Sequence, residues 1–173
     1  MFSTKKVFVV LLLVLLAVSE RLWFDLGPNV ELVTLASVLA GLYLGSLWPV
    51  AVPLLALAIT DRLLGNSLSF LFVWSAYAFL GAYLTRHPKT NVFILAIAFP
   101  VFFFLWTNFG VWLEGLWYPR NFAGLASCFV AALPFFKNHL LSNLVILPLG
   151  VGFASLAKVW RQILKVSRRS QLV

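Results

Sequence analysis

Long apolar runs separated by short polar turns fill almost the whole chain, and this pattern constrains its fold more than any other feature. Of the 173 residues, 62% are hydrophobic and only 10% are charged, whereas about 25% of an average soluble domain is charged. So little polar sequence cannot cover a water-soluble globule, which excludes a soluble enzyme and a disordered chain. A disulfide scaffold is also excluded, because Cys128 is the one cysteine. The remaining class is a polytopic membrane protein.

The apolar runs predict an all-α bundle of six transmembrane helices, since a spanning helix needs about 20 apolar residues. They place these helices at about 7–26, 30–47, 50–64, 68–84, 92–107 and 140–157. A further apolar stretch at 122–136 is short for a span and is interrupted by Pro134. It is predicted to be an interfacial or re-entrant segment before the last helix. The whole chain, 1–173, is predicted to form a single membrane domain.

The first apolar run has two interpretations. Two lysines precede it and the small residues Ala17-Val18-Ser19 end it, as in a cleaved signal peptide. A retained first helix is favoured, because Trp23 and Phe24 continue the run as residues of a membrane interface do. Both interpretations place Glu20 on the outer side of the membrane.

The distribution of charge predicts the orientation of this bundle. If the first helix is retained, six spans put both termini on one side, and nine of the 13 Lys and Arg residues fall there. Positive residues concentrate on the cytoplasmic side of membrane proteins, so both termini are predicted to lie inside the cytoplasmic membrane. The five acidic residues fall on the outer side: Glu20, Asp25, Glu31, Asp61 and Glu114. The net charge of +8 therefore divides into +9 inside and, with four basic residues against five acidic ones, −1 outside.

Polar and aromatic residues gather at the predicted outer ends of the helices. Ionisable groups inside a membrane are costly and usually face a cavity or a partner, and ligand pockets combine aromatic walls with a few polar groups. We therefore predict a small-solute site, in which Trp side chains enclose a heterocycle, Asn side chains bond to it and acidic side chains favour a cationic or hydrogen-donating group. The candidates are Asn29, Glu31, Asp61, Asn66, Trp74, Tyr77, Trp106, Asn108, Trp112, Glu114, Trp117, Tyr118, Asn121, His139 and Asn143.

Simpler interpretations of these residues stay open. Trp and Tyr belts occur at any membrane interface, and Asn or Asp side chains often only cap helices. Asp61 would then pair with its neighbour Arg62 or mark a helix end, and His139 would make a polar contact at a helix start.

Small residues follow one another along the second predicted helix, and several of them are four residues apart, among them Ala36 and Ala40 and the pair Gly41 and Gly45. Such spacing permits close approach of helices, so we expect packing within the bundle. A docking face for a partner subunit is the alternative. The residues are Ala36, Ser37, Ala40, Gly41 and Gly45.

Signatures of enzymes are missing from the sequence. It contains no G-x-x-x-x-G-K-[ST] phosphate loop, H-E-x-x-H, C-x-x-C or G-x-S-x-G motif. No catalytic residue, metal or cofactor is therefore predicted, and Cys128 is expected to pack in an apolar segment. The basic residues of the tail are expected to contact anionic membrane lipids rather than nucleic acid.

Three sequence blocks within 27–152 resemble a known family. The first contains Pro28-Asn29, Glu31, LAGLYLG at 39–45 and VPLLALAITD at 52–61, followed by Gly65-Asn66. The second is WTNFGVW at 106–112, and the third runs from Tyr118-Pro119 through AALPFF at 131–136 to LLSN at 140–143. On these blocks the chain resembles the substrate-binding S components of energy-coupling-factor (ECF) transporters, in an uncharacterised branch of transport proteins.

This resemblance implies a six-helix bundle that captures a vitamin-like micronutrient from the outer side. It also implies two kinds of partner, a transmembrane coupling subunit and cytoplasmic ATPase subunits. The alternative is a structural membrane protein of cell-shape or envelope assembly, similar to small rod-shape proteins of comparable length and basicity, which would bind envelope proteins and no solute.

Overall fold

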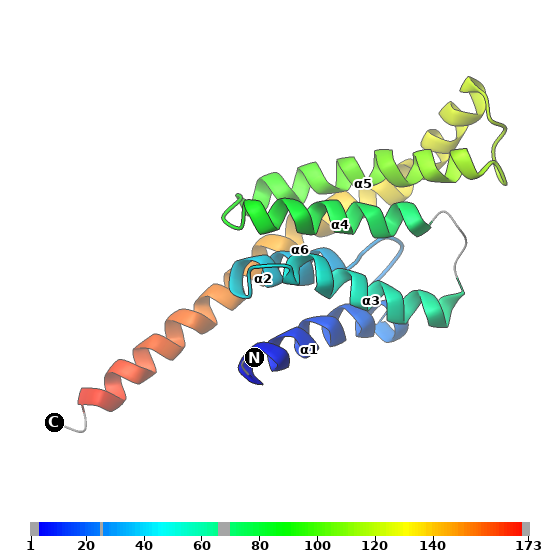
Figure 1. The fold of residues 1–173 in the computed structure, drawn as a ribbon. Helices are drawn as coiled ribbons and strands as arrows, with labels where there is room; N and C mark the ends of the chain where they lie inside the picture. The colour runs from blue at the N-terminus through cyan, green and yellow to red at the C-terminus, as the bar shows by residue number, and fades with distance from the viewer. Residues whose placement is uncertain (1–3, 25, 66–69, 171–173) are drawn as a thin grey trace.

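The computed structural model describes residues 4–24, 26–65 and 70–170, and within these ranges every regular element is a helix. A π-helical turn, η1 (Glu20–Phe24), follows the first helix. The predicted all-α fold is thereby confirmed (Figure 1). The α-helices are α1 (Thr4–Ser19), α2 (Val33–Tyr43), α3 (Trp48–Leu64), α4 (Phe70–Arg86), α5 (Val92–Glu114) and α6 (Phe122–Ser170).

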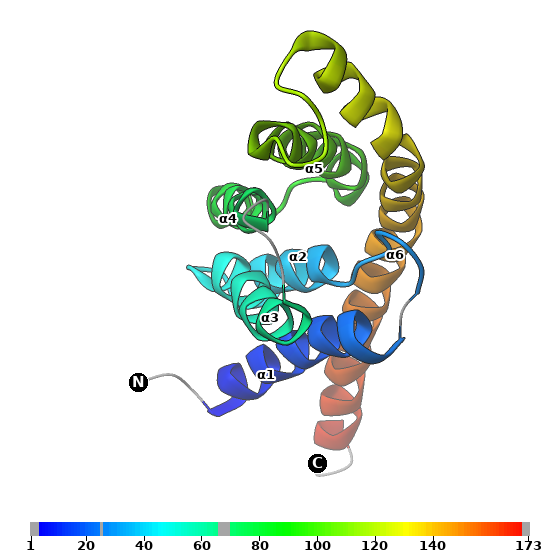
Figure 2. The ribbon, with the colours of Figure 1, turned by 90° about the vertical axis from the view of Figure 1, so that its right-hand side faces the viewer.

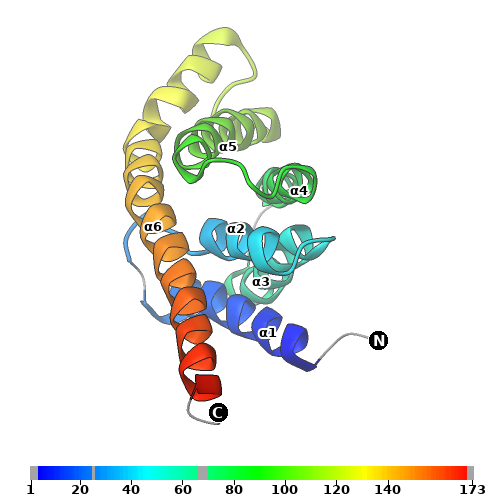
Figure 3. The same ribbon diagram turned by 90° about the vertical axis from the view of Figure 1, so that its left-hand side faces the viewer.

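Five helices form a stack, and α6 crosses it along one flank. Figures 2 and 3 show α5, α4, the pair α2 and α3, and α1 in succession. Along the chain, α6 packs on α5 and also reaches α2. In Figure 1, α1, α3 and α5 end on the same side of the molecule, where α4 and α6 begin. We call this side the acidic end, because Glu20, Glu31, Asp61 and Glu114 lie there; Asp25 is outside the described residues.

Three of the described helical segments are long and apolar enough to cross a membrane: Thr4–Phe24, Val92–Glu114 and Phe122–Trp160. Their outward faces are apolar too, since the side chains of Phe8, Leu11 and Phe153 are 61%, 61% and 70% exposed. Soluble monomers rarely expose large continuous apolar surfaces. These helices are therefore compatible with a multi-pass membrane protein.

Helix α2 is shorter than the sequence predicts and forms the centre of the core. It has 11 residues, about 16 Å of helix, where a span over 30–47 was expected. It begins late because residues 27–30 form a turn, in which the Val30 amide donates to the Gly27 carbonyl. It ends at Tyr43 because Gly45 and Ser46 have positive φ angles of 63° and 52°.

The small residues of α2 lie inside the bundle. Ala36, Ser37 and Ala40 are fully buried, and the Ser37 hydroxyl donates to the Pro49 carbonyl at 2.7 Å. A Cβ atom at Gly41 would meet Leu84 Cβ at 3.3 Å, whereas one at Gly45 would meet nothing within 4 Å. Four of the five residues thus serve close packing of α2 on its neighbours, and Gly45 serves the turn.

The prediction of a separate interfacial segment at 122–136 is wrong, because these residues belong to α6. The structure continues through it without interruption into the last helix, so that α6 has 49 residues and contains both Pro134 and Pro148. A proline removes one backbone N–H donor and bends a helix without always ending it, and Figure 3 shows α6 curved along its length. Helix α5 also runs past its predicted end at 107 and continues to Glu114; within it, the side chains of Thr107 and Asn108 bond to carbonyls of the preceding turn.

Helix α1 is an integral layer of this bundle. It packs on α3 and α2 with a buried face that includes Val10, Leu13, Val14 and Ala17. The turn η1 continues it to Phe24. Because a π-turn changes the direction in which successive side chains leave a helix, it often occurs at functional sites.

Candidate functional site

A network of charged and polar side chains joins four segments at the acidic end. Its hub is Arg21 on η1, whose side chain is 16% exposed. The Arg21 guanidinium donates to Asp61 Oδ1 at 3.0 Å and to Thr60 Oγ1 at 2.9 Å, and it lies 3.5 Å from Glu31 Oε1. All three guanidinium nitrogens are therefore engaged, by α3 and by the loop before α2.

Asp61 is held from two sides near the end of α3. Besides Arg21, the indole N–H of Trp74 on α4 donates to Asp61 Oδ2 at 2.7 Å. The partner of Asp61 is thus a residue 40 positions away, and its neighbour Arg62 is exposed. Buried carboxylates require such pairing because an isolated charge in an apolar environment is costly.

Glu31 links the loop before α2 to α4. The Tyr77 hydroxyl donates to Glu31 Oε2 at 2.6 Å and lies 3.3 Å from the Thr34 hydroxyl. Tyr77 is fully buried. The backbone amide of Leu32 donates to Glu20 Oε2 at 3.3 Å, so a second acidic side chain also binds this loop.

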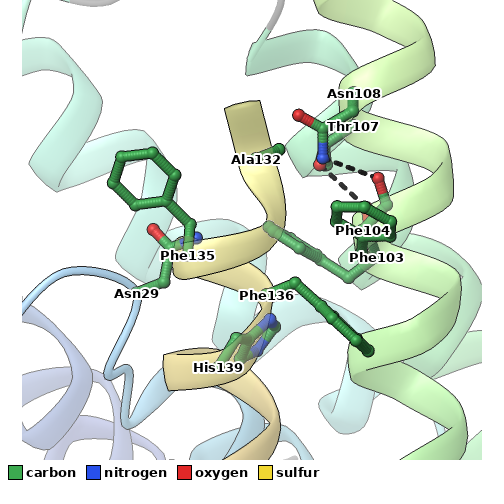
Figure 4. A pocket seen from close by; sticks show the side chains of 9 residues that line it. All are labelled: Asn29, Phe103, Phe104, Thr107, Asn108, Ala132, Phe135, Phe136 and His139. Atoms are coloured by element: carbon green, nitrogen blue, oxygen red, sulfur yellow. Dashed lines mark hydrogen bonds between the residues drawn. The ribbon is translucent and has the colours of Figure 1, made fainter. Parts of the chain in front are cut away.

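A cavity of about 280 Å³ opens beside this network, between α5, α6 and the loop before α2 (Figure 4). Its wall combines four phenylalanine rings with a few polar groups, which is the usual composition of a small-molecule site. The lining residues are Asn29, Phe103, Phe104, Thr107, Asn108, Ala132, Phe135, Phe136 and His139.

His139 is the most unusual residue of this cavity. Its side chain is only 2% exposed, and its Nε2 atom has no hydrogen-bond partner within the part of the chain that the structure describes. Figure 4 shows the imidazole among the side chains of the cavity wall. An unsatisfied buried polar atom costs about 1–3 kcal/mol, so His139 Nε2 would gain from a hydrogen-bonding partner in the cavity.

The network and the cavity share one wall. The Phe103 ring packs against Tyr77 of the network, with ring centroids 5.8 Å apart, and against His139, with centroids 4.9 Å apart. Asn29 is two residues from Glu31 in the same loop and lines the cavity with a positive φ of 59°. Non-glycine residues with positive φ are uncommon and often occur at ligand sites.

The structure brings together about half of the predicted site residues. Glu31, Asp61, Trp74 and Tyr77 form the network, and Asn29, Asn108 and His139 line the cavity. Asn143 lies one turn beyond His139, is 2% exposed, and donates to the His139 carbonyl at 2.8 Å. Asn66 is outside the described residues.

The other predicted residues lie away from the cavity. Trp106 donates to the Ser75 hydroxyl at 2.8 Å and stacks on Phe102, at an outer groove between α4 and α5. The remaining five lie in the last turn of α5 and in the projecting connection that leads to α6, and none is among the described cavity-lining residues. They are Trp112, Glu114, Trp117, Tyr118 and Asn121.

Polar groups of this connection stabilise its own backbone. The Trp112 indole donates to the Pro119 carbonyl at 3.1 Å, and Arg120 donates to the Glu114 carbonyl at 3.0 Å. Asn121 Oδ1 accepts from the Gly124 amide at 2.8 Å, which caps the start of α6. Trp117 is 78% exposed. Their arrangement fits the simpler interpretation of interface aromatics and helix caps.

Sequence reasoning missed Arg21 and the phenylalanine wall. Arg21 lies just after an apolar run, and a charge in that position requires a partner. This requirement could have identified Arg21 as a member of a polar network. The sequence did not single out the phenylalanines of the wall, because α5 contains many Phe residues, among which Phe103 and Phe104 line the cavity. In the described part of the chain, no three His, Cys, Asp or Glu residues are grouped so that they could hold a metal ion.

Comparison with known proteins gives one match. The model of a protein family of unknown function, DUF6580, matches residues 2–166. No curated protein and no solved structure matches the chain.

Proposed function

The chain belongs to DUF6580, a family of unknown function, and we propose that it is the solute-binding subunit of a membrane importer. In this role it resembles the S components of ECF transporters. It would capture a small, vitamin-like micronutrient from the outer side of the cytoplasmic membrane and would not itself be an enzyme.

The cavity beside His139 carries this proposal. Two independent features coincide there, an aromatic-walled space of about 280 Å³ and a buried imidazole nitrogen without a partner in the described residues. A bound solute with a complementary hydrogen-bonding group would satisfy that nitrogen. The cavity also lies at the acidic end, where the proposed topology places the outer face of the membrane.

The proposed topology has six spans with both termini in the cytoplasm. It is supported by the alternation of the helices and by the concentration of basic residues at the opposite end, among them Lys5, Arg86, Lys89 and Lys158. Because the sequence contains no phosphate-binding loop, energy would come from separate ATPase subunits, through a transmembrane coupling subunit.

Native mass spectrometry of the gently purified protein tests this function. We expect a retained small molecule on the wild-type protein, and its loss from the His139→Phe variant, which keeps a ring but removes both nitrogens. His87→Phe is the matched control, since His87 is exposed in the α4–α5 connection. A protein that carries no solute and co-purifies with cell-shape proteins would instead support the envelope-assembly alternative.

A further inference from the structure

We propose that the cavity binds an uncharged or singly cationic aromatic heterocycle with both donor and acceptor groups, and that it rejects anions. This inference rests on the proposed function, because it assigns the chemical class of the solute. The charge, the shape and the hydrogen-bonding groups of the cavity wall all favour such a solute.

No cationic side chain is available to an anion in this cavity. The described lining residues include no Lys or Arg. Arg21, the basic residue of the adjoining network, has all three nitrogens committed to Thr60, Asp61 and Glu31. Lys137 is exposed on α6, two residues and therefore roughly 200° around the helix from His139.

An anion would also meet unfavourable charge near the cavity. Arg21 pairs with both Glu31 and Asp61, so these ion pairs leave one carboxylate in excess of the single guanidinium. Glu31 belongs to the same loop as Asn29, and its carboxylate accepts from Tyr77, whose ring packs on the Phe103 wall. Moving a carboxylate or phosphate out of water without a cationic partner is strongly unfavourable. A neutral ring avoids this penalty, and a single positive charge would be attracted by the acidic side chains.

The wall of the cavity suits a flat aromatic ring. Phe104 and Phe136 face each other with ring centroids 4.7 Å apart at 36°, and Phe103 meets His139 at 82°. Aromatic rings prefer offset or edge-on contacts with one another. The volume of about 280 Å³ is below the range of about 300–1,000 Å³ typical of drug-sized ligands, which indicates one or two rings.

Three polar groups define the hydrogen bonds of the solute. The Asn108 amide N–H donates to the Phe104 carbonyl at 2.7 Å, so the Asn108 side chain keeps its carbonyl oxygen as an acceptor. The Asn29 side chain has no hydrogen-bond partner among the described residues and offers both a donor and an acceptor. His139 Nε2 adds a third site. A heterocycle with N–H and ring-nitrogen groups matches this set.

Matched pairs of probes test the proposed class. The full-length protein in lipid nanodiscs is titrated by calorimetry with nicotinamide and nicotinate, and with quinoline-3-carboxamide and quinoline-3-carboxylate. Each pair keeps the ring and replaces a neutral amide, which has N–H donors, by an anionic group of similar size that only accepts hydrogen bonds. We expect at least one carboxamide to bind at least about tenfold more tightly than its carboxylate, and His139→Phe to abolish that binding while His87→Phe retains it. Equal or tighter binding of the carboxylates overturns the class.

The outcome for the class is distinguishable from the outcome for the function. If native mass spectrometry detects a bound solute but neither carboxamide binds, the proposed class fails and the proposed function stands. If no solute is retained and no probe of either charge binds, both proposals fail. If a carboxamide binds to His139→Phe as tightly as to the wild type, the assignment to this cavity is overturned.

Discussion

Arg21 and Asp61 form a 3.0 Å ion pair between the π-helical turn after α1 and the last turns of α3. The same guanidinium reaches Glu31 in the loop before α2, and through Glu31 and Tyr77 the interaction extends to α4. One basic side chain therefore fixes the relative positions of three helices and of the loop that carries Asn29 into the cavity. Its loss is expected to affect both stability and solute binding.

Replacement of Arg21 by Met is expected to lower the free energy of unfolding by about 3–5 kcal/mol, because it leaves buried carboxylates without their partner. The measurement is the unfolding of the purified protein in one detergent, at constant lipid content. Arg62→Met is the matched control, since Arg62 adjoins Asp61 in sequence but is exposed. Equal destabilisation by the two substitutions would show that the Arg21–Asp61 pair contributes no more than an exposed arginine does.

The Tyr77 hydroxyl is expected to stabilise the fold through its bond to Glu31. Tyr77→Phe removes a 2.6 Å hydrogen bond to a carboxylate and should cost about 2 kcal/mol. Tyr83→Phe, on the same helix, removes an exposed hydroxyl that accepts from Thr90 at 3.3 Å. That control should change the unfolding free energy by less than about 0.5 kcal/mol, and a similar cost for both variants would show that the Tyr77–Glu31 bond contributes little.

Gly81 marks the closest approach of α4 to the start of α3. A Cβ atom there would lie 2.5 Å from the Pro49 carbonyl oxygen and 2.6 Å from Val50 Cα. Because these are backbone atoms, Gly81→Ala should destabilise the bundle by about 1–3 kcal/mol. Gly152→Ala on α6 meets no atom within 4 Å and should stabilise it by up to about 1 kcal/mol. Thermal unfolding midpoints that do not differ between the two variants would contradict this packing.

His139 is expected to reduce stability while it supports binding. Since Nε2 has no partner in the described structure, His139→Phe removes an unsatisfied buried atom and should raise the unfolding free energy of the solute-free protein by about 1 kcal/mol. The same variant should lose solute binding. A variant that is both less stable and unable to bind would indicate that His139 serves packing, whereas the opposite changes in the two measurements identify a ligand-binding residue.

Residue patterns predicted the helices well where each apolar run ended at a turn signal. The starts of α3 and α5 lie within two residues of their predicted positions, because Gly, Pro and Asn mark the connections, whereas the predicted start at 68 lies outside the described residues. The end of α5 and the continuity of α6 were not predictable in this way. Whether Thr107, Asn108 or Pro134 interrupts a helix depends on side-chain bonds and tertiary packing that local propensity does not contain.

Only part of the site was accessible to sequence reasoning, and the reason is physical. Glu31 and Asp61 were predictable because each is an acidic residue in or beside an apolar run, and a buried charge needs a partner. The identity of that partner, Arg21, is a tertiary relationship over 40 residues. Tryptophans were expected around the solute, but the structure surrounds the cavity with Phe103, Phe104, Phe135 and Phe136, because position on α5 and α6, rather than residue type, decides which rings face it.

The separation of charge predicts the orientation of the bundle, and cysteine labelling measures it. In a Cys128→Ser background, Trp117→Cys places a thiol in the α5–α6 connection, where the native side chain is 78% exposed, and Lys89→Cys places one in the exposed α4–α5 connection. A membrane-impermeant maleimide should label position 117 in intact cells and position 89 only after permeabilisation, because positive residues are retained in the cytoplasm. The reverse labelling pattern would place the cavity on the cytoplasmic side of the membrane. A solute could then not be captured from outside, and the proposed function would be excluded.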